Sequence, residues 1–183
     1  MCAQRASLPV FTIGHSTHAF AVFAGLLQAH AIACVVDVRR LPGSRRHPQF
    51  DGPALAEALA PLGIDYLHLS ALGGRRGRSL PSGTPSPNGY WENASFRCYA
   101  DYAMSADFHA GLTQLLALCA HQRCTLMCAE VLWWRCHRRI ITDYLLSAGR
   151  TVCHIAGDGR AAPATMTPAA VRAGDHLVYP PGA

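Results

Sequence analysis

Two short stretches late in the chain contain residue types that carry out chemistry in proteins. Met127-Cys128-Ala129-Glu130 closes an apolar run, and Arg135-Cys136-His137-Arg138-Arg139 follows soon afterwards. Residues two apart on a strand share a face, so Cys128 and Glu130 can face one pocket. A thiol, a carboxylate and an imidazole can supply a nucleophile, a general acid or base and a proton carrier. We therefore take Cys128, Glu130 and His137 as candidate catalytic residues.

Structural alternatives exist for the first stretch. A carboxylate at the end of a buried strand costs several kcal/mol if it is unpaired. Glu130 therefore needs either a catalytic proton or a structural ion pair, for which Arg138 and Arg39 are the candidate partners. Cys128 can equally be an inert thiol of the core.

The second stretch places cations at the start of a helix that the apolar pattern predicts from Trp133 to Ser147. Arg135, Arg138 and Arg139 are mildly unfavourable in its first turns unless an anion binds nearby, because the helix dipole is positive there. The same position favours the thiolate of Cys136, although Cys136 can also belong to the buried stripe of this helix. We expect Cys136 and Arg138 to contact an anionic substrate.

Two further strand ends carry polar residues. His15 follows a first apolar run, and Asp37-Val38-Arg39 ends a second one. Arg39 can hold a phosphate or carboxylate bidentately while Asp37 orients His15, or the two can form an internal ion pair. Arg45 lies in the following loop, which can fold over a ligand. We expect His15 to assist catalysis, and Asp37, Arg39 and Arg45 to bind substrate.

The sequence predicts no metal site and assigns no cofactor. His15, Cys128, Cys136 and His137 are ligand types that suit zinc and similar metals. No pair has a recognised ligand spacing, because the adjacent Cys136 and His137 would point about 100° apart on a helix. The eight cysteines include no CxxC pair, so we expect neither a zinc ribbon nor a disulfide framework.

The elements that must position these residues alternate between strand and helix. Apolar patterns predict strands over 10–14, 33–38, 65–69, 124–129 and 151–156, and helices over 16–31, 53–62, 96–104, 105–121 and 133–147. This alternation predicts an α/β fold, a single three-layer, Rossmann-like domain with a mainly parallel sheet of about five strands. Ligands bind such sheets at the carboxyl ends of the strands. A strand order of 3-2-1-4-5 would bring His15 beside Cys128 and Glu130.

The segments outside this pattern are expected to be irregular. We assign 1–9 to an N-terminal extension, 10–157 to the α/β domain and 158–183 to a C-terminal extension with a short helix near 168–173. The segment 73–93 is rich in Gly, Pro, Ser and Arg and predicts a long loop, which in a compact domain is functional or disordered.

Composition indicates a folded protein with a cationic surface. Half of the residues are hydrophobic and 15% are charged, as in globular proteins. The net charge of +5 comes from arginine alone, and the arginines cluster at 39–46, 75–78 and 135–139. Such clusters favour an anionic small molecule or a nucleic acid as partner. No apolar run reaches the ~18 residues of a membrane-spanning helix, and no signal peptide is evident. We therefore expect a cytoplasmic protein without a membrane partner.

The motifs, taken together and in order, resemble those of the domain-of-unknown-function 488 (DUF488) family. They are TIGHS (12–16), DVR (37–39), YLHLSALGGRR (66–76), FRCYADYAM (96–104), LMCAE (126–130) and CHR (136–138). The resemblance covers roughly 10–157 and implies a compact α/β domain with a polar pocket around these motifs, but it implies no reaction. The apolar segment 131–134 departs from the more polar link that the family usually has there.

Three functions are consistent with these features. The leading hypothesis is an enzyme acting on an anionic, phosphate-bearing substrate related to nucleotides or nucleic acids, with Glu130 as general acid or base. The second is a non-catalytic nucleic-acid-binding module, whose affinity would fall steeply with salt. The third is a thiol redox or metal-binding protein that uses the cysteines.

Overall fold

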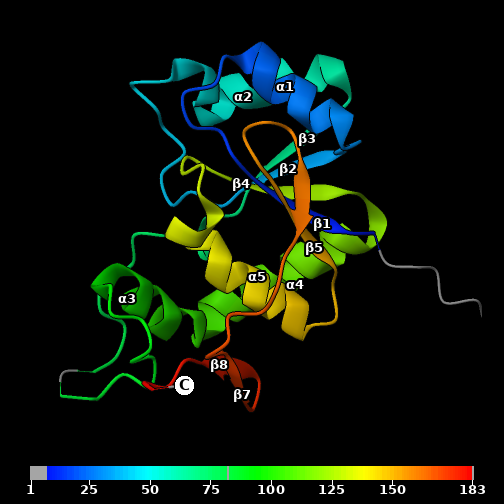
Figure 1. Cartoon of the computed structure of the whole chain (residues 1–183). Helices are drawn as coiled ribbons and strands as arrows, with labels where there is room; N and C mark the ends of the chain where they lie inside the picture. The colour runs from blue at the N-terminus through cyan, green and yellow to red at the C-terminus, as the bar shows by residue number, and fades with distance from the viewer. Residues whose placement is uncertain (1–7, 82, 183) are drawn as a thin grey trace, which may run out of the picture.

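A six-stranded sheet lies between two layers of helices (Figure 1). The computed structural model describes residues 8–81 and 83–182, and every structural statement below refers to these residues. The strands are β1 (Val10–Gly14), β2 (Cys34–Asp37), β3 (Asp65–His68), β4 (Cys124–Cys128), β5 (Val152–Ile155) and β6 (Ala161–Pro163). Their order is β3-β2-β4-β1-β5-β6, and all neighbours are parallel except β5 and β6.

Helices cover both faces of the sheet. One face carries α1 (Phe20–Ala29) and α2 (Gly52–Leu59), and the other carries α3 (Ala94–Ala103), α4 (Ala106–His121) and α5 (Arg138–Ser147). Short 3-10 turns lie at η1 (Pro48–Phe50), η2 (Ala60–Leu62), η3 (Ser70–Leu72) and η4 (Trp133–Arg135). Successive strand residues point to opposite faces, so Val35 belongs to the core beneath α1 and α2, while Val36 belongs to the core on the side of α3, α4 and α5. None of the described helices is both long and apolar enough to span a membrane.

The predicted fold class is confirmed, but the strand order differs from the order 3-2-1-4-5 that we considered from the sequence. The first and fourth strands are neighbours as expected, yet β4 lies between β2 and β1. The connection through α1 passes over one strand position before it enters β2, and β4 later fills that position. The sheet also gains β6 from the segment that we expected to be a C-terminal extension.

The helix predicted from Trp133 is divided into two parts. A 3-10 turn covers Trp133–Arg135, Cys136 is extended with φ −125° and ψ 147°, and α5 begins only at Arg138. The ring of Trp133 stacks on His154 of β5 with 4.1 Å between centroids, which holds the turn against the sheet. Cys136 therefore does not belong to the stripe of a helix.

The C-terminal segment packs tightly against the domain. It forms the hairpin β7 (Val171–Ala173) and β8 (His176–Val178), where we expected a short helix (Figure 1). The buried Tyr179 donates its hydroxyl to Asp143 Oδ2 at 3.0 Å, and its carbonyl accepts from Tyr90 of the long loop. This segment thus ties the loop 73–93 to α5.

Stability should fall as the pH is lowered from 7 to 4.5, because His154 is buried. Its Nδ1 lies 2.8 Å from Thr12 Oγ1, and burial lowers the pKa of the ring to about 4. The unfolded chain takes up this proton below about pH 6.5 while the folded protein resists it, so His154 by itself lowers the free energy of unfolding by about 2 kcal/mol. Urea denaturation at both pH values measures the effect. His154→Asn, which keeps an atom for Thr12, should reduce the pH dependence; an unchanged dependence would exclude His154 as its source.

Candidate functional site

A pocket of about 720 Å³ opens at the carboxyl ends of β1 and β4. The chain leaves β1 for α1 on one face and leaves β4 for α5 on the other, an arrangement that opens a ligand crevice in parallel sheets. Gly14 pairs with Cys128 in register. A Cβ atom on Gly14 would overlap the carbonyl oxygen of Glu130, so glycine is required where the segment after β4 crosses the end of β1.

Most of the predicted site residues meet at this pocket. Its lining includes His15, Arg39, Cys128, Glu130, Cys136 and His137. Asp37 and Arg138 are buried directly behind the lining, whereas Arg45 is exposed on the loop and does not line the pocket. The lining also includes residues from loop 40–47, from Gly74 and Arg75, and from the first turns of α3.

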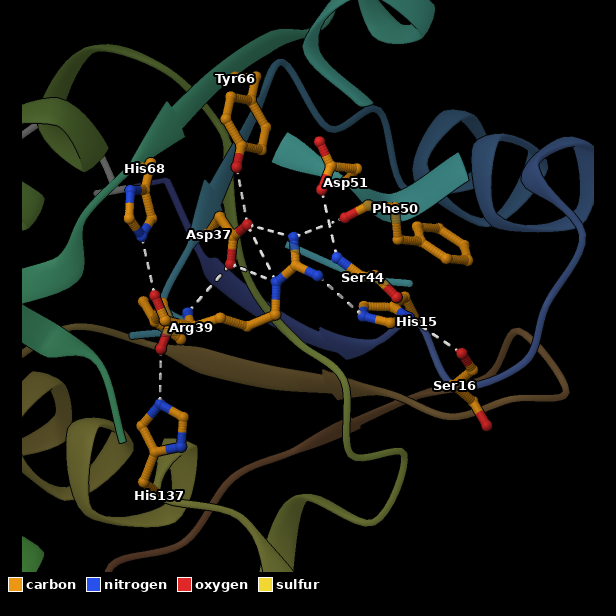
Figure 2. A network of polar contacts seen from close by, with 11 residues as sticks. His15, Ser16, Asp37, Arg39, Ser44, Phe50, Asp51, Tyr66, His68 and His137 are labelled. Atoms are coloured by element: carbon orange, nitrogen blue, oxygen red, sulfur yellow. Dashed lines mark hydrogen bonds and ion pairs between the residues drawn. The ribbon is translucent and has the colours of Figure 1, made fainter. Parts of the chain in front are cut away.

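Asp37 and Arg39 form a buried ion pair beneath the pocket (Figure 2). Arg39 Nη2 lies 2.6 Å from Asp37 Oδ2, and Arg39 Nε lies 2.9 Å from Asp37 Oδ1. Tyr66 donates its hydroxyl to Asp37 Oδ2 at 2.7 Å, and Arg39 Nη2 also donates to the carbonyl of Phe50 at 2.8 Å. Most donors of this guanidinium are therefore used inside the protein. The geometry favours the internal ion pair over direct anion binding by Arg39.

His15 is held in one tautomer by the same network. Its Nδ1 donates to the carbonyl of Ser16 at 3.0 Å, so Nε2 carries the lone pair and accepts from Arg39 Nη1 at 3.3 Å. The ring stacks on Phe50 with 4.2 Å between centroids. Burial, with the nearby Arg39 charge, lowers the pKa of His15 to about 4. A neutral His15 whose basic nitrogen is occupied positions Arg39 and is not free to take a proton from a substrate.

Cys128, Cys136 and His137 form a compact cluster in the pocket wall. Their two sulfur atoms and one imidazole nitrogen all lie within 4.8 Å of one another. Cys136 Sγ lies 3.5 Å from His137 Nδ1. His137 Nε2 lies 2.8 Å from the carbonyl of Val38. Because a carbonyl only accepts, Nε2 carries the hydrogen and Nδ1 presents its lone pair to the sulfur atoms.

Arg138 supports Cys136 from behind the pocket. Its Nε donates to Cys136 Sγ at 3.3 Å, and its Nη2 donates to the carbonyl of Glu130. A hydrogen bond from Cys128, together with the charge of Arg138, lowers the pKa of Cys136 well below its ordinary value. The same hydrogen bond and burial raise the pKa of Cys128. The buried Arg138 thus stabilises charge on a sulfur atom instead of reaching into the pocket.

Glu130 is exposed, which corrects the premise that its carboxylate leaves a buried strand. The strand ends at Cys128, one residue earlier than predicted, so Glu130 lies beyond the sheet. Its Oε1 accepts from the backbone N–H of Leu132 at 3.1 Å, and within the described chain it makes no ion pair with Arg138 or Arg39. The carboxylate therefore remains available at the pocket.

Three exposed arginines at the pocket were not named individually as substrate-binding residues, although Arg135 belongs to the segment 135–139 that we expected near an anion. They are Arg40, Arg75 and Arg135. Arg40 Nη1 donates to the carbonyl of Arg75 at 2.9 Å, and Arg75 has a φ of +56°. A Cβ atom on Gly74 would lie 2.7 Å from His137 Nδ1, so the loop backbone packs against the imidazole. The Gly-Gly pair before Arg75 was the available signal, because paired glycines mark turns and close backbone approach.

Comparison with known proteins identifies the family. Neither the curated proteins nor the solved structures give a match. A family model described as "Domain of unknown function DUF488" matches residues 19–145. This range covers more than half of the chain and contains Cys128, Glu130, Cys136 and His137, whereas β1 and His15 precede it. The chain belongs to the DUF488 family.

Proposed function

We propose that this protein is an enzyme that acts on an anionic, phosphate-bearing substrate related to nucleotides or nucleic acids. The observation that supports this most strongly is the composition of one pocket. Two thiols, an imidazole and a free carboxylate lie together with three exposed arginines. The first group can perform chemistry and the second can hold an anion, and an enzyme needs both at one place.

The roles of the residues follow from their surroundings. Arg40, Arg75 and Arg135 are exposed and can turn their guanidinium groups toward a phosphate, which they bind bidentately. Glu130 is the general acid or base, because its carboxylate is exposed to the pocket and not neutralised by an arginine. Phe96 of α3 also lines the pocket and offers an aromatic face to a base.

A non-catalytic nucleic-acid-binding module accounts for less of this structure. Such modules track the backbone with basic groups and stack bases on aromatic side chains in an open groove. This mode of binding does not require two thiols and an imidazole within 4.8 Å of one another at the wall of a pocket. The cluster therefore favours the enzyme.

Binding of phosphate-bearing ligands should depend on the arginines of the pocket. In calorimetric titrations with nucleoside monophosphates and pyrophosphate, we expect the wild-type protein to bind, and Arg40→Ala/Arg75→Ala to bind at least about tenfold more weakly. A charge-assisted hydrogen bond contributes about 1.5–3 kcal/mol, which sets this scale.

The matched control is Arg45→Ala/Arg46→Ala, which removes two arginines that are also exposed but do not line the pocket. This control should bind like the wild type. Equal losses in both double variants would indicate unspecific attraction to positive charge. No binding of any phosphate-bearing ligand by the wild-type protein would contradict the proposed substrate class.

A further inference from the structure

We propose that Cys128, Cys136 and His137 bind one Zn²⁺ ion, and that the fourth coordination position of this ion opens into the pocket. Among the residues that the structure describes, no other group of three histidine, cysteine or acidic side chains brings its ligand atoms together in this way. The binding of the ion does not depend on the function proposed above. A role of the ion in turnover rests on that function, because the ion would act in the same pocket.

The distances between the ligand atoms fit a tetrahedral zinc ion. Bonds of about 2.3 Å to sulfur and about 2.0 Å to nitrogen, at tetrahedral angles, place a sulfur and a nitrogen ligand about 3.5 Å apart. Cys136 Sγ and His137 Nδ1 lie 3.5 Å apart, and Cys128 Sγ lies within 4.8 Å of both. One ion can therefore contact all three atoms after small side-chain adjustments.

The imidazole of His137 is already oriented as a metal ligand. Its Nε2 hydrogen is donated to the carbonyl of Val38 at 2.8 Å, which leaves the Nδ1 lone pair directed at the sulfur atoms. Metal-bound histidines are commonly fixed by such a hydrogen bond from the second ring nitrogen. Gly74 and the ring of Tyr99, whose centroid is 5.0 Å away, confine the imidazole further.

The charges around the cluster also suit a divalent ion with soft ligands. Two thiolates and a neutral imidazole balance the charge of Zn²⁺, and thiolates favour zinc over magnesium or calcium. Arg138 Nε donates to Cys136 Sγ at 3.3 Å and is itself buried, so it helps to hold one sulfur atom in place. Hydrogen bonds of this kind to ligand atoms raise metal affinity.

A break in the helix explains how two adjacent residues can bind the same ion. On a helix Cys136 and His137 would point about 100° apart, which argued against a shared metal. Cys136 is instead extended, with φ −125° and ψ 147°, and α5 begins only after His137. The change in backbone direction between the two residues turns both side chains toward Cys128.

The fourth position has the character of a catalytic zinc site. Structural zinc ions have four protein ligands, whereas catalytic ones have three and keep a position for water or substrate. All three ligands line the pocket, and so does Glu130, which is not part of the ligand group. A water molecule or a substrate oxygen can thus reach the ion from a pocket that Glu130 also lines.

Metal analysis of the 183-residue chain, made without a histidine tag, tests the proposal. We expect about one zinc ion per chain in the wild type, and at least a tenfold lower content in Cys128→Ser, Cys136→Ser and His137→Ala. Cobalt added to chelator-treated protein should give the near-ultraviolet charge-transfer bands of thiolate–cobalt bonds. The matched control is Cys153→Ser, which removes a free thiol outside the cluster and should retain both the zinc and the bands.

Two results would overturn the metal site. The first is a wild-type protein that holds no zinc and shows no thiolate–cobalt bands. The second is zinc that remains in the folded Cys128→Ser/Cys136→Ser variant, with folding checked by circular dichroism. The metal analysis and the calorimetric titrations with nucleoside monophosphates, both made on the wild-type protein, separate the two proposals. A protein that binds nucleotides but takes up neither zinc nor cobalt would reject the metal site and keep the substrate class, while a protein that binds zinc but no nucleotide would do the reverse.

Discussion

The Asp37→Ala variant is expected to lose about 3–5 kcal/mol of stability, because it leaves the guanidinium of Arg39 buried without its counter-charge. Asp37 is fully buried and Arg39 is 7% exposed, so water cannot replace the lost carboxylate. The variant also removes the acceptor of the Tyr66 hydroxyl, which lies 2.7 Å from Asp37 Oδ2. The total stability of a domain is about 5–15 kcal/mol, so this single change removes much of it.

Guanidinium denaturation followed by circular dichroism measures this loss. Asp65→Ala is the matched control, because Asp65 is an exposed carboxylate on the neighbouring β3. This substitution should lower the free energy of unfolding by less than about 0.5 kcal/mol. Asp37→Asn keeps the shape of the side chain and an acceptor for Tyr66, so its free energy of unfolding should lie between those of Asp37→Ala and Asp65→Ala. If Asp37→Ala does not fold, Asp37→Asn can still be compared with the control. An Asp37→Ala protein as stable as the Asp65→Ala control would show that the ion pair does not hold the floor of the pocket.

Glu130→Gln is expected to lower kcat by about 10²–10⁴-fold on a nucleotide that the binding screen identifies, while the fold stays intact. Glutamine retains a side-chain oxygen that can accept from the Leu132 N–H, so the local structure should not change. It cannot, however, exchange a proton with a substrate. Product formation followed by liquid chromatography gives kcat and KM separately.

The control for this variant is Glu57→Gln, an exposed carboxylate on α2 that does not line the pocket. Its kcat should equal that of the wild type. If Glu130→Gln instead raised KM at an unchanged kcat, Glu130 would bind the substrate without transferring a proton. If neither constant changed, Glu130 would have no part in the reaction.

Local patterns in the sequence were sufficient to predict the layers of the fold and the edge of the sheet at which the polar residues meet. The periodicities of β1, β2 and β4 placed polar residues at three strand ends, and the carboxyl ends of parallel strands share one edge of the sheet. His15, Arg39, Cys128 and Glu130 therefore meet at the pocket. The strand order was not predictable in the same way, because apolar runs do not encode which strand pairs with which.

The errors at the site have a common physical origin in tertiary contacts. Arg138 has the sequence context of an anion-binding residue, but its donors are used by Cys136 and by a backbone carbonyl. The stacking of Trp133 on His154 lies at the break before α5, and this break brings the cluster together. Tyr66 was not singled out, although the strand order considered from the sequence already places β3 beside β2, because apolar patterns do not encode which side chain a tyrosine hydroxyl contacts.

The most direct test of the central claim is a crystal structure of the wild-type protein grown with tungstate, a phosphate-like anion that can be located by its anomalous signal. We predict an anomalous peak in the pocket at the carboxyl ends of β1 and β4, within hydrogen-bonding distance of Arg40, Arg75 or Arg135. An empty pocket at a tungstate concentration that fills sites on other surface arginines, such as Arg45 and Arg46, would contradict the claim that this pocket binds phosphate-bearing substrates.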